Sequence, residues 1–260
     1  MAEKRLKPTK TISTKTVSCL SEKVCAKIRE ASYANIAGAM NLDGASAQRI
    51  LANSYYILHV QQEFDDYCKI ISGEYSAETE LCDICEELRS FCAVVTDIIE
   101  KKGVVLGSAL PNRPVYARVD RRGIRQALAA VVLNAVEHAK QGGKIEVKLE
   151  EAARTVKISV HDNGSGMDEE TLSRCMEPLF SGKMASNNKS PLGLGLTLAR
   201  YYVQKCGGRI KMKSFYKKAT RAEIILPRPK DFSAEELHSA PKPISGYADT
   251  EITVAMAPIL

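Results

Sequence analysis

A carboxylate and two glycines follow one strand-like segment in an arrangement that is able to do chemistry. The segment ISVHDNGSGM alternates apolar and polar residues and then places Asp162 just before Gly164 and Gly166. A carboxylate accepts hydrogen bonds from N–H donors such as an exocyclic amine. Glycines lack a Cβ atom and let the backbone pass close to another group. Taken alone, D-x-G-x-G is also a common tight turn, because Asp, Asn and Gly are the usual turn formers.

Three more stretches carry residues of possible chemical use: QALAAVVLNAVEHA with Asn134, MEPLFSGK with Lys183, and PLGLGLTLAR. Asn134 lies on an apolar helical pattern and offers an amide oxygen, a ligand type that the hard cation Mg²⁺ prefers. The third stretch opens a helix at Gly193–Gly195, where backbone N–H groups and the helix dipole attract phosphate. Each stretch also has a simpler explanation, since a helix start can be merely close-packed and a core amide merely satisfied.

In this order, the four stretches resemble the ATP-binding domain of the sensor histidine kinases, within the wider family that includes gyrase, the Hsp90 chaperones and MutL. The resemblance covers about residues 75–227. It includes RVDRRGIRQAL, which is similar to the family's lead-in to its asparagine box, and CGGRIKMKS and KKATRAEIILP, which are similar to its closing strands.

The resemblance implies that the domain binds ATP and Mg²⁺. Asp162 is then expected to accept a hydrogen bond from the exocyclic amine of adenine, which guanine does not offer at that position. Asn134 is the expected Mg²⁺ ligand, and residues 177–192 are expected to form a mobile lid. The other implied nucleotide contacts are Gly164, Gly166, Lys183, Gly193, Leu194, Gly195 and Thr220.

Three residues depart from the family pattern. Ala130 stands where Asn or Glu is common, four residues before the magnesium asparagine. Glu137 stands where many histidine kinases carry a lysine that contacts phosphate, and Pro191 replaces the first glycine of G-x-G-L-G-L. The sequence therefore supports ATP binding more strongly than efficient phosphoryl transfer.

Residues 16–74 are predicted to form a helical hairpin. Apolar residues recur at three- and four-residue steps up to Met40, NLDGAS then interrupts, and a second pattern places an apolar residue at every seventh position from Ile50 to Ile71. Arms of roughly 35 to 40 Å cannot bury such stripes alone. The pattern predicts a four-helix bundle made by dimerisation.

The hairpin resembles the dimerisation and phosphotransfer module of the same kinases, whose first helix carries His-Glu-x-Arg. The best local match is AKIR at 26–29, where Ala26 replaces the nucleophile. Alanine has no nitrogen to attack a γ-phosphate, so the usual autophosphorylation is not expected. His59 is a candidate acceptor facing solvent on the second helix, although a surface or interface histidine is the simpler interpretation. His138 and His161 are expected to be structural.

The predicted fold class is α+β, with the hairpin followed by a two-layer α/β sandwich over residues 75–228. A basic segment at 1–15 and a flexible, proline-containing tail at 229–260 flank these domains. The expected helices lie at about 81–98, 121–140 and 193–206, and the expected strands near 104–106, 115–119, 144–150, 155–161, 209–214 and 221–226.

Composition limits the partners. The net charge of +6 comes from dispersed Lys and Arg, and Trp is absent, so nucleic-acid binding is not expected. No apolar run approaches about 18 residues and no signal peptide is evident, which predicts a cytoplasmic protein without membrane insertion. The eight cysteines fall in apolar patterns and are expected to be reduced. Cys82 and Cys85 lack a second pair, which disfavours a metal or redox site.

The preferred hypothesis is an ATP-binding, sensor-histidine-kinase-like phosphotransferase of a two-component pathway, acting as a homodimer with a response-regulator-like partner. Two alternatives stay open. One is a non-enzymatic, ATP-gated interaction module, favoured by Ala26 and Ala130. The other is an anti-sigma type of serine kinase, which the stretch NAVEHA also resembles.

Overall fold

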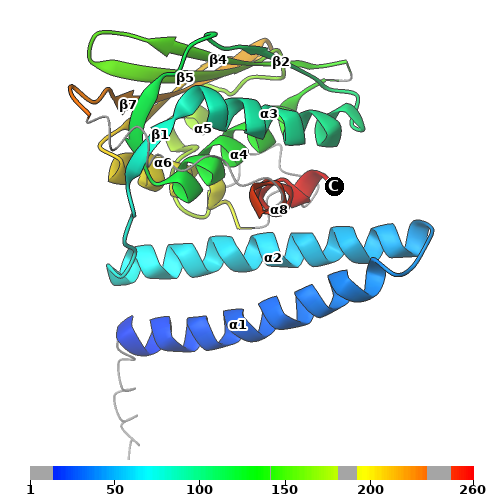
Figure 1. Ribbon diagram of the computed structural model, residues 1–260. Helices are drawn as coiled ribbons and strands as arrows, with labels where there is room; N and C mark the ends of the chain where they lie inside the picture. Colours follow the sequence, from blue (N-terminus) through cyan, green and yellow to red (C-terminus); the bar gives the residue numbers. More distant parts are fainter. Residues whose placement is uncertain (1–13, 141, 181–191, 233–246) are drawn as a thin grey trace, which may run out of the picture.

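The computed structural model describes the chain except for residues 1–13, 141, 181–191 and 233–246. Two long helices, α1 (Thr14–Ala39) and α2 (Ala45–Ser72), form a hairpin that lies along one side of the molecule (Figure 1). Gly44 precedes α2 and Gly73 ends it, with φ of 91° and 76°. Glycine adopts this left-handed region at little steric cost, which explains why the helix begins and ends at these positions.

A five-stranded sheet forms the opposite side of the molecule (Figure 1). Its strand order is β2-β4-β5-β7-β6, with β2 and β4 parallel and the remaining neighbours antiparallel. The strands are β2 (Val105–Ala109), β4 (Lys144–Glu151), β5 (Thr155–Asp162), β6 (Arg209–Phe215) and β7 (Ala219–Pro227). A separate pair, β1 (Glu80–Asp83) and β3 (Tyr116–Val119), is antiparallel.

Helices pack on one face of this sheet and form the second layer. They are α3 (Ile84–Glu100), α4 (Arg121–His138) and α6 (Gly195–Lys205), and the short α5 (Glu169–Arg174) follows the β5 loop. Aspartates cap three of them: Asp83 accepts from the backbone N–H of Cys85, Asp120 from that of Gly123, and Asp168 from that of Thr171. One continuous apolar core joins sheet and helices.

Helix α2 docks on this domain through a polar clamp around Asp66, which is only 2 % exposed. The Asp66 carboxylate accepts a hydrogen bond from Arg122 Nη2 at 2.8 Å and one from the Tyr202 hydroxyl at 2.5 Å. Tyr75, just after α2, donates its hydroxyl to Asp120 at 3.0 Å. The clamp therefore ties the hairpin to the start of α4 and to α6.

The last residues also fold, in contrast to the flexible tail expected for 229–260. Helix α8 (Tyr247–Ala255) and the 3-10 turn Ala257–Ile259 lie between α2 and the helices of the sandwich (Figure 1). Ile252 and Met256 are at most 1 % exposed and join the main core, whereas Val254 joins the hairpin's own cluster. The segment thus bridges two apolar clusters, which explains its burial.

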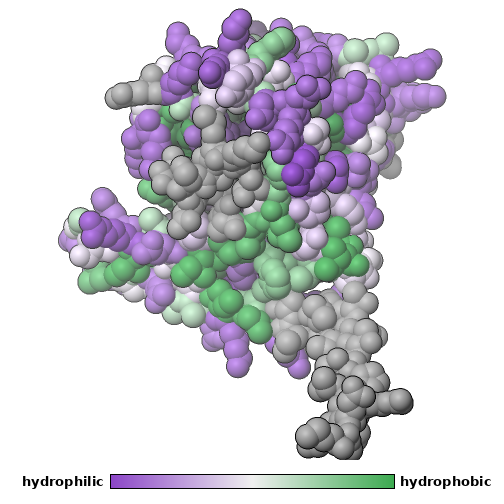
Figure 2. Space-filling model, turned by 180° about the vertical axis from the view of Figure 1, so that it is seen from behind, coloured by the Kyte–Doolittle hydropathy of each residue, from purple (hydrophilic) through white to green (hydrophobic). Residues whose placement is uncertain are grey.

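Apolar side chains stay exposed along the hairpin. Figure 2 shows them gathered over the hairpin half of the molecule, while the half that contains the sheet is mostly hydrophilic. The predicted seven-residue repeat is part of this surface: Ile50, Ile57, Phe64 and Ile71 are between 39 % and 54 % exposed. Dimerisation through this stripe remains a prediction.

The α+β fold class, with a helical hairpin before a two-layer sandwich, is confirmed. The four-residue strand β1 and the six-residue helix α5 were not predicted. Within the described residues, no helix is both long and apolar enough to cross a bilayer.

Candidate functional site

Asp162 is the last residue of β5 and lies on the helix side of the sheet, where it is 4 % exposed. Its Oδ1 atom accepts backbone hydrogen bonds from Gly164 at 2.8 Å and from Thr220 at 3.3 Å. Burial raises the pKa of the Asp162 carboxyl, and the two backbone donors oppose that rise. Both bonds go to Oδ1, and no described residue donates to Oδ2, so this second oxygen is available to another donor.

The two glycines after Asp162 are required by the chain's own packing. A Cβ atom on Gly164 would overlap the backbone oxygen of His138 at the end of α4. Gly166 has φ +62°, and a Cβ there would overlap the backbone oxygen of Phe215. The close approach predicted for these glycines is therefore real, but the group that they approach in this structure is protein backbone.

Thr220 lies opposite Asp162 in the register of β5 and β7. It is 5 % exposed, and its hydroxyl lies 3.1 Å from that of Ser214. Ser214 accepts a hydrogen bond from the backbone N–H of Met167 at 2.7 Å. Ser214 was not predicted, and its signal would have been its pairing with Thr220 across β6 and β7. Hydrogen bonds therefore connect Asp162, Thr220 and Ser214 with the backbone of the loop from Gly164 to Met167, and we call this set the polar group around Asp162.

Asn134 is half-buried on α4. It lies one turn after Ala130, so both share the face of α4 that meets the start of α6. The methyl group of Ala130 lies 3.6 Å from the point where a Cβ on Gly195 would stand. No hydrogen bond is recorded for the Asn134 amide among the described residues, which leaves its oxygen available as a ligand.

The second glycine stretch forms the start of α6 as predicted. Gly193 has φ +59°, and a Cβ there would lie 2.8 Å from the backbone oxygen of Phe180. Leu194 is 1 % exposed and anchors the turn in the core, and the helix begins at Gly195. The backbone N–H of Leu179 donates to the oxygen of Gly193 at 3.1 Å, which ties the start of the expected lid to this turn.

Lys183 and Pro191 lie outside the described residues, as does most of the stretch expected to form a lid. The contact between Lys183 and phosphate therefore stays a prediction. His238 is outside them too.

His59 is buried at 8 % exposure, so it is not the solvent-facing acceptor that was considered for α2. Burial lowers its pKa to about 4, which keeps the ring neutral near pH 7. Ala26 is exposed on α1. Within the described chain, the hairpin therefore presents no accessible histidine.

Glu63 was not predicted to belong to the site. It projects from α2, is 8 % exposed, and its Oε1 atom lies 3.2 Å from the position of a Cβ on Gly195. Sequence patterns gave no signal for it, because its place depends on how the hairpin docks.

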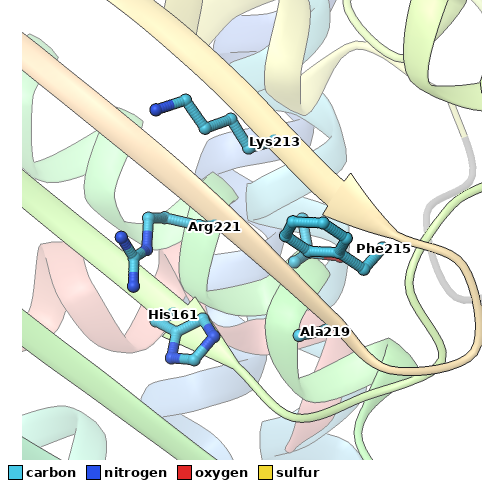
Figure 3. A pocket seen from close by; sticks show the side chains of 6 residues that line it. His161, Lys213, Phe215, Ala219 and Arg221 are labelled. Carbon is cyan, nitrogen blue, oxygen red and sulfur yellow. The ribbon is translucent and has the colours of Figure 1, made fainter.

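A small hollow lined by His161, Lys213 and Arg221 opens on the outer face of the sheet (Figure 3). Successive strand residues point to opposite faces, so His161 and Asp162 are on different sides. Thr220 also lines this hollow and donates its backbone N–H to Asp162, so the hollow adjoins the polar group around Asp162.

The seven cysteines whose side chains the structure describes are free thiols. Cys82 and Cys85 are fully buried, and burial raises the pKa of Cys82 to about 12. Among the residues that the structure describes, no cluster of three His, Cys, Asp or Glu side chains is placed to hold a metal ion.

Residues 119–230 match the family described as "Histidine kinase-, DNA gyrase B-, and HSP90-like ATPase". This domain belongs to that ATPase family. The match begins at the end of β3 and extends just past β7, so it contains Asn134, Asp162, Gly195 and Thr220.

Curated relatives of the chain include histidine kinases. It is 26 % identical to the histidine protein kinase DivJ of Caulobacter vibrioides, over 70 % of this chain and 30 % of DivJ. It is 31 % identical to the alginate biosynthesis sensor protein KinB of Pseudomonas aeruginosa, over 62 % of this chain and 27 % of KinB. The sensor histidine kinase YcbM of Bacillus subtilis is 29 % identical, over 51 % of this chain and 43 % of YcbM. The chain spans less than half the length of these relatives.

Solved structures share the fold over most of the chain. Full-length ShkA in complex with AMPPNP has a TM-score of 0.67 at 16 % identity, covering 85 % of this chain and 47 % of ShkA. The histidine kinase AdeS of Acinetobacter baumannii has a TM-score of 0.56 at 19 % identity, covering 80 % of this chain and 97 % of the AdeS chain. Residues 119–230 therefore form a domain of this ATPase family, and the chain as a whole is similar to histidine kinases in sequence and fold.

Proposed function

We propose that the chain binds Mg·ATP and acts as a histidine-kinase-like signal transduction protein of a two-component pathway. The observation that carries the proposal is the buried Asp162 carboxylate, which uses Oδ1 for two backbone donors and leaves Oδ2 available. The exocyclic amine of adenine is a matching donor. Guanine has a carbonyl oxygen at that position, and two acceptors would face each other without a proton.

The same proposal gives the remaining residues their tasks. Asn134 offers its amide oxygen to Mg²⁺, which neutralises charge on the phosphates when it is bound. Helix α6 begins at Gly195 and offers backbone N–H groups and the positive end of its dipole to phosphate. Thr220 and the loop of Gly164 and Gly166 surround the carboxylate and hold it in place.

A homodimer is part of the proposal. The exposed apolar stripe of α2 runs at the seven-residue spacing that suits helix packing between subunits. The partner that receives the output is proposed to be a response-regulator-like protein that contacts the hairpin.

A non-enzymatic, ATP-gated interaction module is the second candidate function. Ala26 is exposed at the matching position of α1, and His59 is buried, which favours a hairpin that is not phosphorylated. In this case, nucleotide binding changes the surface that is offered to the partner. The anti-sigma type of serine kinase is supported less, because of the long hairpin and Ala130.

Calorimetric titration with Mg·ATP tests the nucleotide site. Asp162→Asn replaces the available oxygen or its neighbour with an N–H donor, and we expect binding to weaken by about 10- to 100-fold. His161→Asn is the matched control, because it changes the adjacent residue on the other face of β5. Equal affinity of wild type and Asp162→Asn would contradict the site.

Incubation with γ-³²P-ATP and Mg²⁺ then separates the two candidate functions. Acid-labile, alkali-stable label that is absent from Asp162→Asn would establish a histidine autokinase. Nucleotide binding without any label would establish the interaction module.

A further inference from the structure

The side chain of Glu63 lies against the start of α6. A Cβ built on Gly195 would have Glu63 Oε1 as its nearest neighbour, at 3.2 Å, and the Ala130 methyl group at 3.6 Å. Two small residues, Gly195 and Ala130, therefore leave the space that the carboxylate from α2 fills. Glu63 is 8 % exposed, and its Oε2 atom has no hydrogen-bond partner among the described residues.

The groups around Glu63 do not balance a negative charge. His59 Nε2 lies 3.7 Å from Oε1, but burial lowers the His59 pKa to about 4, so this ring is neutral near pH 7. Burial raises the pKa of Glu63 to about 7, and the like charges of Glu137 on α4 and Asp66 on α2 add to the rise. An unbalanced buried carboxylate is costly, and the positive end of the α6 dipole is the feature that favours it here.

The hairpin is held in this position by contacts other than Glu63. Asp66 accepts from Arg122 and Tyr202, and α8 packs against both α2 and α4. These contacts fix α2 so that the Glu63 carboxylate meets the start of α6 while the hairpin is docked.

We propose that Glu63 is a built-in competitor of the nucleotide phosphates, so that docking of the hairpin and binding of a triphosphate oppose each other at the start of α6. The inference rests on the proposed nucleotide site. A phosphate group at this helix start and an ionised carboxylate at the same place are both anions, and both occupy the positive end of the same helix dipole. Binding of ATP then favours release of α2 from the ATPase domain, which couples nucleotide to the exposure of the hairpin.

The test compares nucleotide affinities of the full chain with those of Glu63→Gln. The substitution keeps size and removes charge, so we expect Mg·ATP to bind about 5- to 150-fold more tightly, the usual range of coupling between sites. Adenosine lacks phosphates and is expected to bind wild type and variant equally. Glu22→Gln, which removes a negative charge from the exposed side of α1, is the matched control and is expected to change neither affinity.

Hydrogen exchange gives a second readout, in which saturating Mg·ATP is expected to speed exchange in α2 of the wild type. Unchanged or weaker ATP binding by Glu63→Gln, with adenosine binding intact, would overturn the competition and leave the nucleotide site standing. Failure of wild type and variant to bind either adenosine or ATP would overturn the proposed site and this inference with it.

Discussion

Asp66 is the residue whose replacement tests most sharply how the hairpin is attached. Asp66→Asn keeps the shape of the side chain and removes its charge. The carboxylate receives one bond from the Tyr202 hydroxyl, which is buried, and one from Arg122, whose side chain is 40 % exposed. Both donors meet the same oxygen, Oδ2, so the Asn amide oxygen can still accept both bonds, but it accepts them as a neutral group without the charge that strengthens them.

The expected loss follows from the number and burial of these bonds. A hydrogen bond to a charged group contributes about 1.5 to 3 kcal/mol, and the solvent near Arg122 reduces the contribution of that arm. We expect Asp66→Asn to lower the free energy of unfolding by about 2 to 3 kcal/mol. At about 2 to 4 °C per kcal/mol for a chain of this size, the melting temperature should fall by about 4 to 12 °C.

Asp65→Asn is the matched control. Asp65 is the neighbouring residue on α2 and pairs with Lys69 one turn later in the same helix, at 2.8 Å. Asp65 is itself buried, but solvent reaches Lys69, whose side chain is 34 % exposed, so this single pair contributes at most about 1 kcal/mol. The assay is thermal and urea unfolding followed by far-UV circular dichroism, since the chain lacks Trp. Equal destabilisation by the two substitutions would refute the clamp.

Three other substitutions give separate expectations. Met256→Ala should lower the free energy of unfolding in urea by about 2 to 5 kcal/mol, because Met256 is fully buried. Leu260→Ala is the control and should change this free energy little, because Leu260 is 41 % exposed. Equal effects of the two substitutions would contradict the docking of α8. Gly166→Ala should lower stability by at least about 2 kcal/mol in a thermal scan, because of its positive φ and the overlap with Phe215, and an unchanged melting temperature would contradict that backbone path. Glu63 has a folded-state pKa of about 7, above its ordinary 4.5, so the wild type should lose stability as pH rises from about 4.5 to 7. Glu63→Gln should therefore be more stable at pH 8, by up to about 3 kcal/mol, and a pH-independent difference from wild type would contradict the burial of a titrating carboxyl.

Local patterns in the sequence were sufficient for the features that depend on local chemistry. The helical hairpin, the strand before Asp162 and the helix start at Gly195 all follow from periodicity and glycine placement. Thr220 was expected at the site only because of the resemblance to the kinase ATP-binding domain. The pairing of β5 with β7 places it beside Asp162. The exposed seven-residue stripe of α2 also matches its pattern.

Features that depend on docking left no such signal. Glu63 and Asp66 have the pattern of ordinary charged residues of an amphipathic helix, yet they are buried because α2 packs against α6 and α8. The tail was misjudged because its prolines suggested an irregular segment, whereas Ile252 and Met256 are four residues apart on one helical face and fill the core.

The central claim is that Asp162 selects adenine nucleotides, and displacement of a fluorescent ADP analogue by Mg·ATP or Mg·GTP tests it most directly. The account predicts that ATP displaces the analogue from the wild type at concentrations at least about tenfold below those needed for GTP, and that Asp162→Asn removes this preference. Equal displacement by ATP and GTP, or a preference that survives in Asp162→Asn, would contradict it.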